Sequence, residues 1–228
     1  MLTHLRGKFI VFDGTEGCGK STQAALLRDA LAREAVDALL VRDPGTTRIG
    51  EMVRGILLDP DHGEMGMRCE MLLYMAARAQ MMVETIRPAL DAGRAVISDR
   101  FVSSTLAYQL GGDGLSAADI RAVADVAIAG RWPDVTVLLD LPAEASMARV
   151  KPKKLTTAGD GGAVVDKDRI ERRPIEYHRQ VRENYLAQAK ADPARYRVVD
   201  ATRTIDAVHA DVLAALAALP SPGVRGEG

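Results

Sequence analysis

The clearest chemical signal in the chain is the segment GTEGCGKS, from Gly14 to Ser21. It matches the pattern G-x-x-x-x-G-K-[ST] at every fixed position, with an apolar run before it and a helical pattern after it. This context is typical of a phosphate-binding loop. The glycines let successive backbone N–H groups point inward at an anion, and the following helix adds its positive end. The segment therefore predicts a site for the phosphates of a nucleotide.

Within this loop, Lys20 is expected to reach the β and γ phosphates, and Ser21 to place its hydroxyl on Mg²⁺. Cys18 is interpreted as a small residue that the loop accommodates, rather than as a nucleophile. The loop alone does not show whether the terminal phosphate passes to water, to a protein or to a small acceptor. The residues predicted to contact the nucleotide are Gly14, Thr15, Glu16, Gly17, Cys18, Gly19, Lys20, Ser21 and Thr22.

A second segment, AVISDRFVSSTLAYQ (95–109), carries polar side chains at the end of a predicted strand. Asp99 stands where ligands gather in open parallel sheets, and its carboxylate could hold Mg²⁺ through water. Asp140 also ends an apolar run, so this position alone is a weak signal. Arg100 follows Asp99 directly, and its forked donors could grip a phosphate. A structural ion pair is the alternative for Arg100.

Two further groups of residues share helical faces. Tyr74 and Arg78 stand at i and i+4, and together they could stack on a base and hydrogen-bond its edge. The alternative is a core-packed tyrosine beside an arginine that reaches solvent. A second polar cluster, which by itself is typical of an ordinary polar helix face, comprises Ser104, Thr105, Tyr108 and Gln109.

Short apolar runs alternate with longer helical patterns, which predicts a three-layer α/β domain. The near-continuous apolar character of the short runs is typical of a parallel sheet that is covered on both faces. Strands are predicted at 8–13, 38–43, 94–99, 135–141 and 196–200. Helices are predicted near 20–34, 49–58, 66–91, 102–109, 116–130, 143–150, 173–191 and 204–218.

The segment 151–168 interrupts this alternation, because it is rich in Gly, Lys and Asp and shows little helical periodicity. It is too long for an ordinary connection, so we expect a mobile lid, spanning about 150–172, or a disordered insert. The chain is otherwise predicted to form a single domain over 1–219, followed by a disordered tail at 220–228.

The amino-acid composition limits the classes of function that the protein could have. The 228 residues are 47% hydrophobic and 27% charged, which is enough chain to bury a sizeable core. A net charge of -1 gives no basic excess that would point to nucleic acid or to an anionic membrane. No apolar stretch reaches the roughly 18 to 20 residues that cross a bilayer, and no signal peptide is recognisable. The two cysteines indicate no disulfide framework, so we expect a cytoplasmic location.

Taken together, the motifs resemble those of the thymidylate kinase family, in that family's order and over nearly the whole chain. The segments that carry the resemblance are FDGTEGCGKSTQ, VRDPGTTRIGE, LLYMAARAQ, SDRFVSSTLAYQ, DRIERRPIEYHRQVRENYL and VVDATRTIDAVHADV. The resemblance implies a nucleoside-monophosphate-kinase fold with a five-stranded parallel sheet. It also implies Mg²⁺-dependent phosphate transfer from ATP to dTMP by an enzyme that is usually a homodimer.

The resemblance assigns roles on the acceptor side by motif position. Tyr74 would stack on thymine, and Arg78 and Gln109 would hydrogen-bond the base, with Thr105 nearby. Tyr108 would close against the sugar and disfavour a 2′-hydroxyl.

Further roles concern the phosphates and the donor. Glu16 would lie near the 3′-hydroxyl of the acceptor, and Arg100 would bind phosphate between donor and acceptor. Arg149 and the segment around Ala201 and Thr202 would lie near the adenine of ATP. Two departures from the family pattern are RDPG in place of REPG and DRF in place of DRY.

The lid departs further from the family pattern. No cation stands at positions 15–18, so the chain is similar to those relatives that supply a catalytic arginine from the lid. Lys153 falls where that arginine would be expected, and Lys154 could share its role. One alternative is that these lysines only form a solvated basic loop. Another is that the lid cation comes from the far side of the insert, from Arg169, Arg172 or Arg173.

Two other functions stay open on the sequence alone. The chain could be a kinase of a different nucleoside monophosphate, or a nucleotide switch that hydrolyses its ligand slowly.

Overall fold

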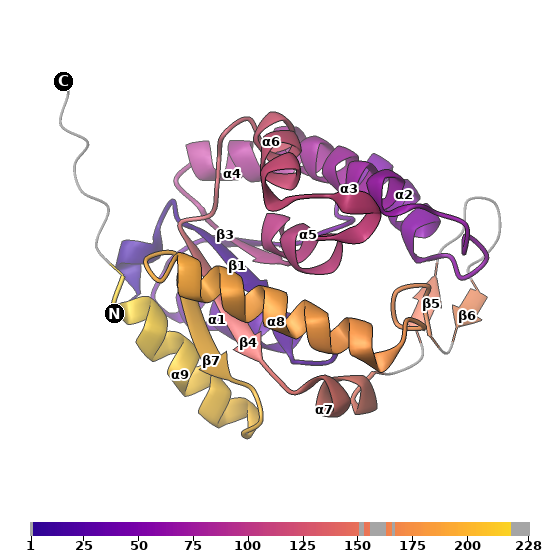
Figure 1. Ribbon diagram of the computed structural model, residues 1–228. Helices are drawn as coiled ribbons and strands as arrows, with labels where there is room; N and C mark the ends of the chain where they lie inside the picture. Colours follow the sequence, from indigo (N-terminus) through magenta and orange to yellow (C-terminus); the bar gives the residue numbers. More distant parts are fainter. Residues whose placement is uncertain (1, 151–152, 156–162, 166, 220–228) are drawn as a thin grey trace.

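Five parallel strands form the central sheet, in the order β2-β3-β1-β4-β7 (Figure 1). The computed structural model describes residues 2–150, 153–155, 163–165 and 167–219. The bounds of the strands are β1 Phe9–Asp13, β2 Ala38–Arg42, β3 Ala95–Asp99, β4 Val135–Asp140 and β7 Tyr196–Asp200. The predicted five-stranded parallel sheet is therefore confirmed.

The central position of β1 determines what meets at the carboxyl edge of the sheet. β1 pairs with β3 on one side and β4 on the other, so Phe12 lies opposite Asp99, and Asp13 opposite Leu138. The chain then leaves β1 directly into the phosphate loop. The loop and the end of β3 are neighbours because of this pairing, although about 80 residues separate them in the sequence.

Alternate strand residues point to opposite faces, and each face has its own helices. Ile10 and Phe12 pack in one core cluster with α1 and α9, while Phe9 and Val11 pack in a second cluster with helices from the middle of the chain. On the first face lie α1 Lys20–Arg33 and α9 Ile205–Ala217. The second face is covered by α3 Met67–Met81, α4 Arg87–Asp91, α5 Val102–Tyr108 and α6 Ala117–Ile128.

Two further helices border the site. α2 Arg48–Leu58 and α8 Ile175–Ala191 contribute to a third apolar cluster, and α8 runs across α5 in Figure 1. The short helix α7 Ala143–Ala148 follows β4. Short 3₁₀ turns lie at Thr3–Leu5 and Gly112–Gly114.

The helix predicted over 66–91 is interrupted by a π-helical turn, Met82–Ile86, between α3 and α4. Pro88 stands within the first turn of α4. A proline has no N–H to donate and its ring crowds the carbonyl four residues before it, so a regular α-helix cannot pass through this point unchanged. A wider turn ahead of the proline accommodates it.

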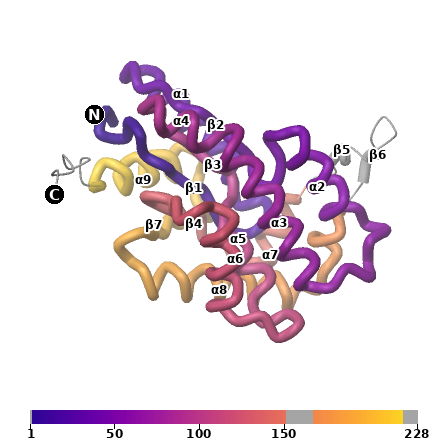
Figure 2. Tube along the Cα trace, turned by 90° about the horizontal axis from the view of Figure 1, so that it is seen from above, coloured from indigo at the N-terminus to yellow at the C-terminus, as the bar shows by residue number. Residues whose placement is uncertain are grey.

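The predicted lid contains an element that the sequence did not indicate. Strands β5 Lys153–Leu155 and β6 Ala163–Val165 pair antiparallel as a small sheet separate from the central one. This pair lies at the end of the molecule away from both chain termini (Figure 1), and α2 lies on that same side, away from both termini, when the molecule is seen from above (Figure 2). The predicted tail, 220–228, lies outside the described residues.

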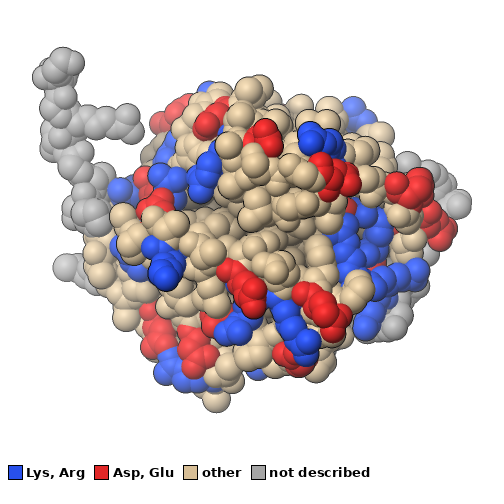
Figure 3. Space-filling view, viewed as in Figure 1, with Lys and Arg blue, Asp and Glu red and all other residues tan. Residues whose placement is uncertain are grey.

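Charged side chains of both signs are interspersed over the face shown in Figure 3, with Lys and Arg gathered toward the end at which α8 begins. Among the described residues, no helix combines the length and the apolar character needed to cross a membrane.

Candidate active site

A cavity of about 420 Å³ opens at the carboxyl edge of the sheet. The phosphate loop forms one wall, and side chains from α2, α3 and α5 form the other. The cavity thus brings together residues that the sequence places almost a hundred positions apart. Of the predicted site residues, those that line it are Glu16, Gly17, Gly19, Lys20, Ser21, Thr22, Tyr74, Arg78, Asp99, Arg100, Thr105, Tyr108 and Gln109.

The phosphate loop is closely fitted to its surroundings. A Cβ at Gly14 would meet the carbonyl oxygen of Leu139 at 2.5 Å, and a Cβ at Gly17 would meet that of Ser146 at 2.6 Å. Glycine is therefore required at both positions, since any larger residue would push the loop away from β4 and α7. Gly19 caps α1 with a φ of 102°, in the left-handed region that glycine adopts freely.

Lys20 and Ser21 stand at the first turn of α1. The ammonium group of Lys20 donates to the carbonyl oxygens of Gly14 and Thr15, at 3.2 and 2.7 Å. It is thus held across the loop, in the position from which a phosphate can be reached. The hydroxyl of Ser21 donates to the carboxylate of Asp99, which joins the loop to the end of β3.

Cys18 is buried beneath this loop, and its sulfur lies 3.6 Å from the Lys20 ammonium. Burial raises the pKa of the thiol, which keeps it protonated and unreactive. Its surroundings are those of a small core residue, in agreement with the sequence interpretation.

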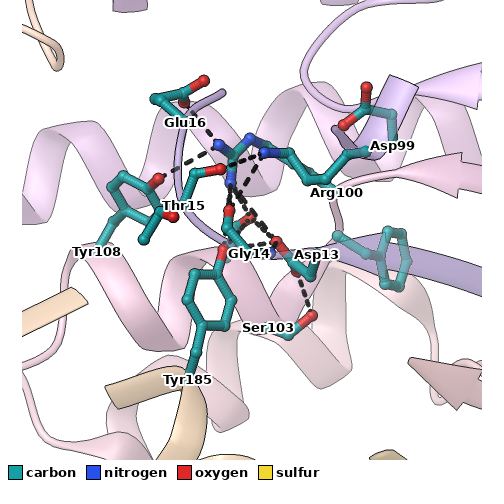
Figure 4. Close-up of polar contacts among 12 residues, drawn as sticks. Asp13, Gly14, Thr15, Glu16, Asp99, Arg100, Ser103, Tyr108 and Tyr185 are labelled. Carbon is teal, nitrogen blue, oxygen red and sulfur yellow. Dashed lines mark hydrogen bonds and ion pairs between the residues drawn. The ribbon is translucent and has the colours of Figure 1, made fainter. Parts of the chain in front are cut away.

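Arg100 stands at the centre of the site (Figure 4). Its Nη2 donates to Glu16 at 2.6 Å and to the Tyr108 hydroxyl at 3.2 Å. Its Nη1 donates to the Gly14 carbonyl oxygen at 3.1 Å and lies 3.5 Å from Asp13. Burial by itself would lower the pKa of the guanidinium, but Glu16 and the other acidic groups around it raise that pKa well above its ordinary value. The site therefore keeps one cation fixed between the phosphate loop and α5.

Asp13, the residue just before the loop, was given no role by the sequence. It is fully buried and accepts hydrogen bonds from the hydroxyls of Ser103, Ser104 and Tyr185, the first two at 2.5 and 2.7 Å. Its carboxylate ties β1 to α5 and α8. The sequence offered no signal for this role, because Tyr185 lies 172 positions away from Asp13.

Arg78 does not reach solvent, since only 1% of its side chain is exposed. It forms an ion pair with Asp43 at 2.6 Å and donates to the Phe101 carbonyl oxygen at 3.1 Å and to the Thr105 hydroxyl at 3.3 Å. Burial raises the pKa of Asp43, and the charge of Arg78 opposes that rise. One oxygen of Asp43, Oδ1, is buried without a hydrogen-bond partner among the described residues.

Tyr74 is half-buried and lines the same cavity as Arg78 and Thr105. Burial raises the pKa of its hydroxyl, so the ring presents a neutral face. Gln109 is buried too, and its amide nitrogen donates to Glu70 at 2.6 Å. The sequence did not single out Glu70.

On the donor side, Arg149 and Ala201 are in contact, because the arginine Nη1 donates to the alanine carbonyl oxygen at 3.3 Å. Lys153 belongs to β5, of which only the backbone is described, so its predicted side-chain role lies outside the described part of the chain. Arg169 and Arg173 are both paired with Glu70. Residues that line the cavity but were given no substrate contact by the sequence are Arg42, Asp43, Pro44, Arg54, Leu58, Ser104, Asp168 and Ile170.

A phosphate loop at the carboxyl edge of a five-stranded parallel sheet, facing Tyr74, Arg78 and Gln109 across one cavity, is typical of P-loop kinases that act on small nucleotides. The family model for thymidylate kinase matches residues 12–212. The chain belongs to the thymidylate kinase family.

Individual relatives agree. The thymidylate kinase of Nitratidesulfovibrio vulgaris is 42% identical over 217 residues, which cover 95% of this chain and 99% of that protein. That of Desulforudis audaxviator is 46% identical over 87% of this chain and 85% of its own length. The crystal structure of thymidylate kinase from Ehrlichia chaffeensis superimposes with a TM-score of 0.70 at 28% identity, covering 92% of this chain and 98% of the other.

The reaction follows from the family. The chain is an enzyme that phosphorylates dTMP to dTDP with ATP as co-substrate. This assignment favours the thymidylate interpretation over a kinase of another nucleoside monophosphate and over a nucleotide switch.

Proposed function

We propose that the cavity described above holds both substrates and that its residues divide the transfer of the γ-phosphate among them. The observation that carries this proposal is the single cavity lined by the phosphate loop on one side and by Tyr74, Arg78 and Gln109 on the other. Arg100 stands between the two sides, so it is placed where donor and acceptor phosphates would meet.

The acceptor occupies the side formed by α3 and α5. Tyr74 stacks on thymine, Arg78 and Gln109 hydrogen-bond its edge, and Thr105 supports Arg78. Tyr108 closes against the sugar and disfavours a ribonucleotide. Four groups surround the Arg78 guanidinium: Asp43, Met75, Thr105 and Phe101. The contact of Nη1 with the Thr105 hydroxyl is the longest of them, at 3.3 Å, so Nη1 is the nitrogen best able to turn to the base.

The donor occupies the phosphate loop and the surface beside α7. The backbone from Gly14 to Thr22 wraps the phosphates, and Lys20 neutralises the β and γ groups. Arg149 and Ala201 lie near adenine, a role that their mutual contact supports. Glu16, held by Arg100, lies near the 3′-hydroxyl of the acceptor.

Mg²⁺ is proposed to bind at Ser21 and, through water, at Asp99. The two side chains are in contact and offer hard oxygen donors, which this ion prefers. Among the described residues, no group of three or more His, Cys, Asp and Glu could hold a metal ion. A site with few protein ligands fits Mg²⁺, which keeps several waters and binds substrate phosphates. When bound, the ion neutralises charge on the phosphates.

The protein forms no covalent bond to the phosphate during the transfer. An oxygen of the dTMP phosphate, already anionic, bonds to the γ-phosphorus while the bond from that phosphorus to the β,γ-bridging oxygen breaks and ADP leaves. No general base is needed. Catalysis is positioning and charge neutralisation by Lys20, Arg100 and a lid cation, for which we propose Lys153.

We further propose a single domain over 1–219, with a lid at about 150–172 that excludes water during transfer. The enzyme is proposed to work as a cytoplasmic homodimer. The free cysteines Cys18 and Cys69 support a reducing location, and exposed apolar side chains on α2 and α3 support the dimer.

The proposal is tested by offering dTMP, dUMP, UMP, CMP, AMP and GMP in turn, each with ATP and Mg²⁺. We expect dTMP to be the best acceptor and dUMP a poor one, because the missing methyl group is worth about 1–3 kcal/mol. Purine nucleotides should fail, since the stack on Tyr74 is bounded by Arg78 and Gln109. ADP release that does not depend on an acceptor, or efficient use of AMP or GMP, would contradict the proposal.

A further inference from the structure

Glu70 is a buried carboxylate on α3 that none of the roles above uses. Its side chain is completely shielded from solvent. One oxygen, Oε1, accepts from the amide nitrogen of Gln109 at 2.6 Å. The other, Oε2, accepts from Nη2 of Arg173 at 2.6 Å and from Nη2 of Arg169. Two cations and one amide therefore surround a single carboxylate.

This arrangement determines which end of the Gln109 amide faces Glu70. An ionised carboxylate can only accept hydrogen bonds, and of the two ends of an amide only the NH₂ can donate. The NH₂ must therefore face Glu70, so the carbonyl oxygen Oε1 is the end that remains for the cavity that Gln109 lines. Gln109 makes no other side-chain hydrogen bond within the described residues that would engage that oxygen.

The orientation matters because the pyrimidine bases differ at the edge that Gln109 would read. Thymine and uracil carry an N–H at ring position N3, whereas cytosine has an unprotonated nitrogen there. A carbonyl oxygen accepts from the first kind of base and meets only a lone pair on the second. A site built to hydrogen-bond one partner strongly rejects an analogue that cannot complete the bond.

We infer that Glu70 is a positioning residue that fixes the polarity of the Gln109 amide, and that it thereby selects bases with an N3–H over cytosine. The inference rests on the proposed contact between Gln109 and the base. Glu70 itself touches no substrate. It acts on the base indirectly, through the side chain of Gln109.

The two arginines make the inference testable by one substitution. In Glu70→Gln, the new amide has one end that can accept and one that can donate. Arg169 and Arg173 can only donate, so they attract the carbonyl end of the new side chain. Its NH₂ then faces Gln109, which must turn its own carbonyl oxygen toward residue 70 and its NH₂ toward the cavity. The substitution should therefore reverse the polarity that the base meets.

The experiment measures kcat/KM for dTMP and for dCMP, with ATP, on the same preparation of each variant. In Glu70→Gln, the ratio of the dTMP value to the dCMP value should fall at least tenfold, on the order expected for one mismatched buried hydrogen bond. The change should come from a higher KM for dTMP and a lower KM for dCMP. Because both substrates are measured on one preparation, any loss of folded enzyme cancels from the ratio.

The matched control is Glu84→Gln. Glu84 also accepts from a glutamine amide, that of Gln80, but both are at the surface. Its ratio should equal that of the wild type. If Glu70→Gln lowered both values by the same factor, Glu70 would have only a structural role and the inference would be wrong. Failure of the proposed function looks different: the Gln109→Ala variant would then discriminate as well as the wild type does.

Discussion

Arg100 illustrates how individual charges are held in this site. It has a φ of 73°, which is uncommon for a residue with a side chain, and it directly follows β3. The strain is offset by contacts with Glu16, Gly14 and the Tyr108 hydroxyl, which together fix the guanidinium from three directions. A cation held in place before substrate arrives stabilises developing charge without having to reorganise.

Loss of Lys20 should affect the rate of phosphate transfer far more than it affects dTMP binding. Lys20→Ala removes positive charge from the β and γ phosphates, and we expect kcat to fall by roughly 100-fold or more. KM for dTMP should change little, because Lys20 lies on the donor side. Steady-state kinetics measure both. Lys190→Ala, an exposed lysine in the last turn of α8, is the control and should be silent. Near-normal turnover of Lys20→Ala would contradict the role given to the loop.

Some residues of the site could be predicted from the sequence and others could not, because their surroundings in the fold differ. Residues of the phosphate loop, Asp99, Arg100 and the pair Tyr74 and Arg78 were predicted for the site and line the cavity, because fixed spacing or family motifs single them out. Asp13 and Glu70 were missed. A buried carboxylate looks the same in the sequence as an exposed one, since what buries it is its partners from distant elements. Asp13 contacts Arg100 and Glu70 contacts Gln109, so each acid lies against a residue that the sequence predicted for the site.

The ion pair between Asp43 and Arg78 joins the end of β2 to α3. Both side chains are only 1% exposed. Removing one partner leaves the other charge buried without compensation, which typically costs about 3–5 kcal/mol. We therefore expect Asp43→Ala to lower the free energy of unfolding by about that amount. Urea denaturation without nucleotides is the measurement.

Two comparisons sharpen this prediction. Asp37→Ala removes the partner of Arg94 from a surface pair and should cost only about 0–1 kcal/mol. The double variant Asp43→Ala/Arg78→Leu should cost less than the sum of the two single changes, because no orphaned charge remains. Equal costs for Asp43→Ala and Asp37→Ala would show that the buried pair does not hold β2 and α3 together.

The segment between α7 and α8 is predicted to supply the lid cation. Arg169 and Arg173 are committed to Glu70, and Arg172 is exposed and donates to the Lys167 carbonyl oxygen. These contacts favour Lys153 as the lid cation. Lys153→Ala should lower the single-turnover rate by about 100-fold and leave dTMP binding unchanged.

Two matched variants complete that experiment. Lys153→Arg keeps the charge and should retain activity or increase it, while Arg172→Ala should be silent. If Lys153→Ala were silent and Arg172→Ala inactive, the cation would come from the far side of the insert.

Most elements were predictable because short apolar runs and helical periodicity determine them locally. All five central strands and all eight predicted helical segments are present, with ends that differ by a few residues at most. The π-helical turn before Pro88 was missed because its length depends on how a proline is accommodated, not on periodicity. The hairpin of β5 and β6 was missed because three-residue strands leave too short an alternation to recognise.

For the whole molecule, α2 and α3 together expose four large apolar side chains. Ile49, Met52 and Ile56 recur on one face of α2 and are 42%, 51% and 43% exposed. Leu72 on α3 is 53% exposed, and α2 and α3 pack against each other. Apolar side chains gathered in this way mark an interaction surface, and we propose a second copy of the chain as its partner.

A charge placed on that surface should dissociate the dimer. We expect Leu72→Glu to sediment as a monomer at micromolar concentration and the wild type to sediment as a dimer, because burying an unpaired carboxylate in an interface is costly. Ile205→Glu is the control, since Ile205 is also exposed, at 59%, but stands at the start of α9 on the opposite face of the sheet. That variant should remain dimeric.

The inner side of α3 carries Tyr74 and Arg78 into the cavity, so loss of the partner should loosen the helix and raise KM for dTMP more than it lowers kcat. A wild-type enzyme that sediments as a monomer, or a Leu72→Glu variant that stays dimeric, would place the contact between subunits elsewhere or remove it.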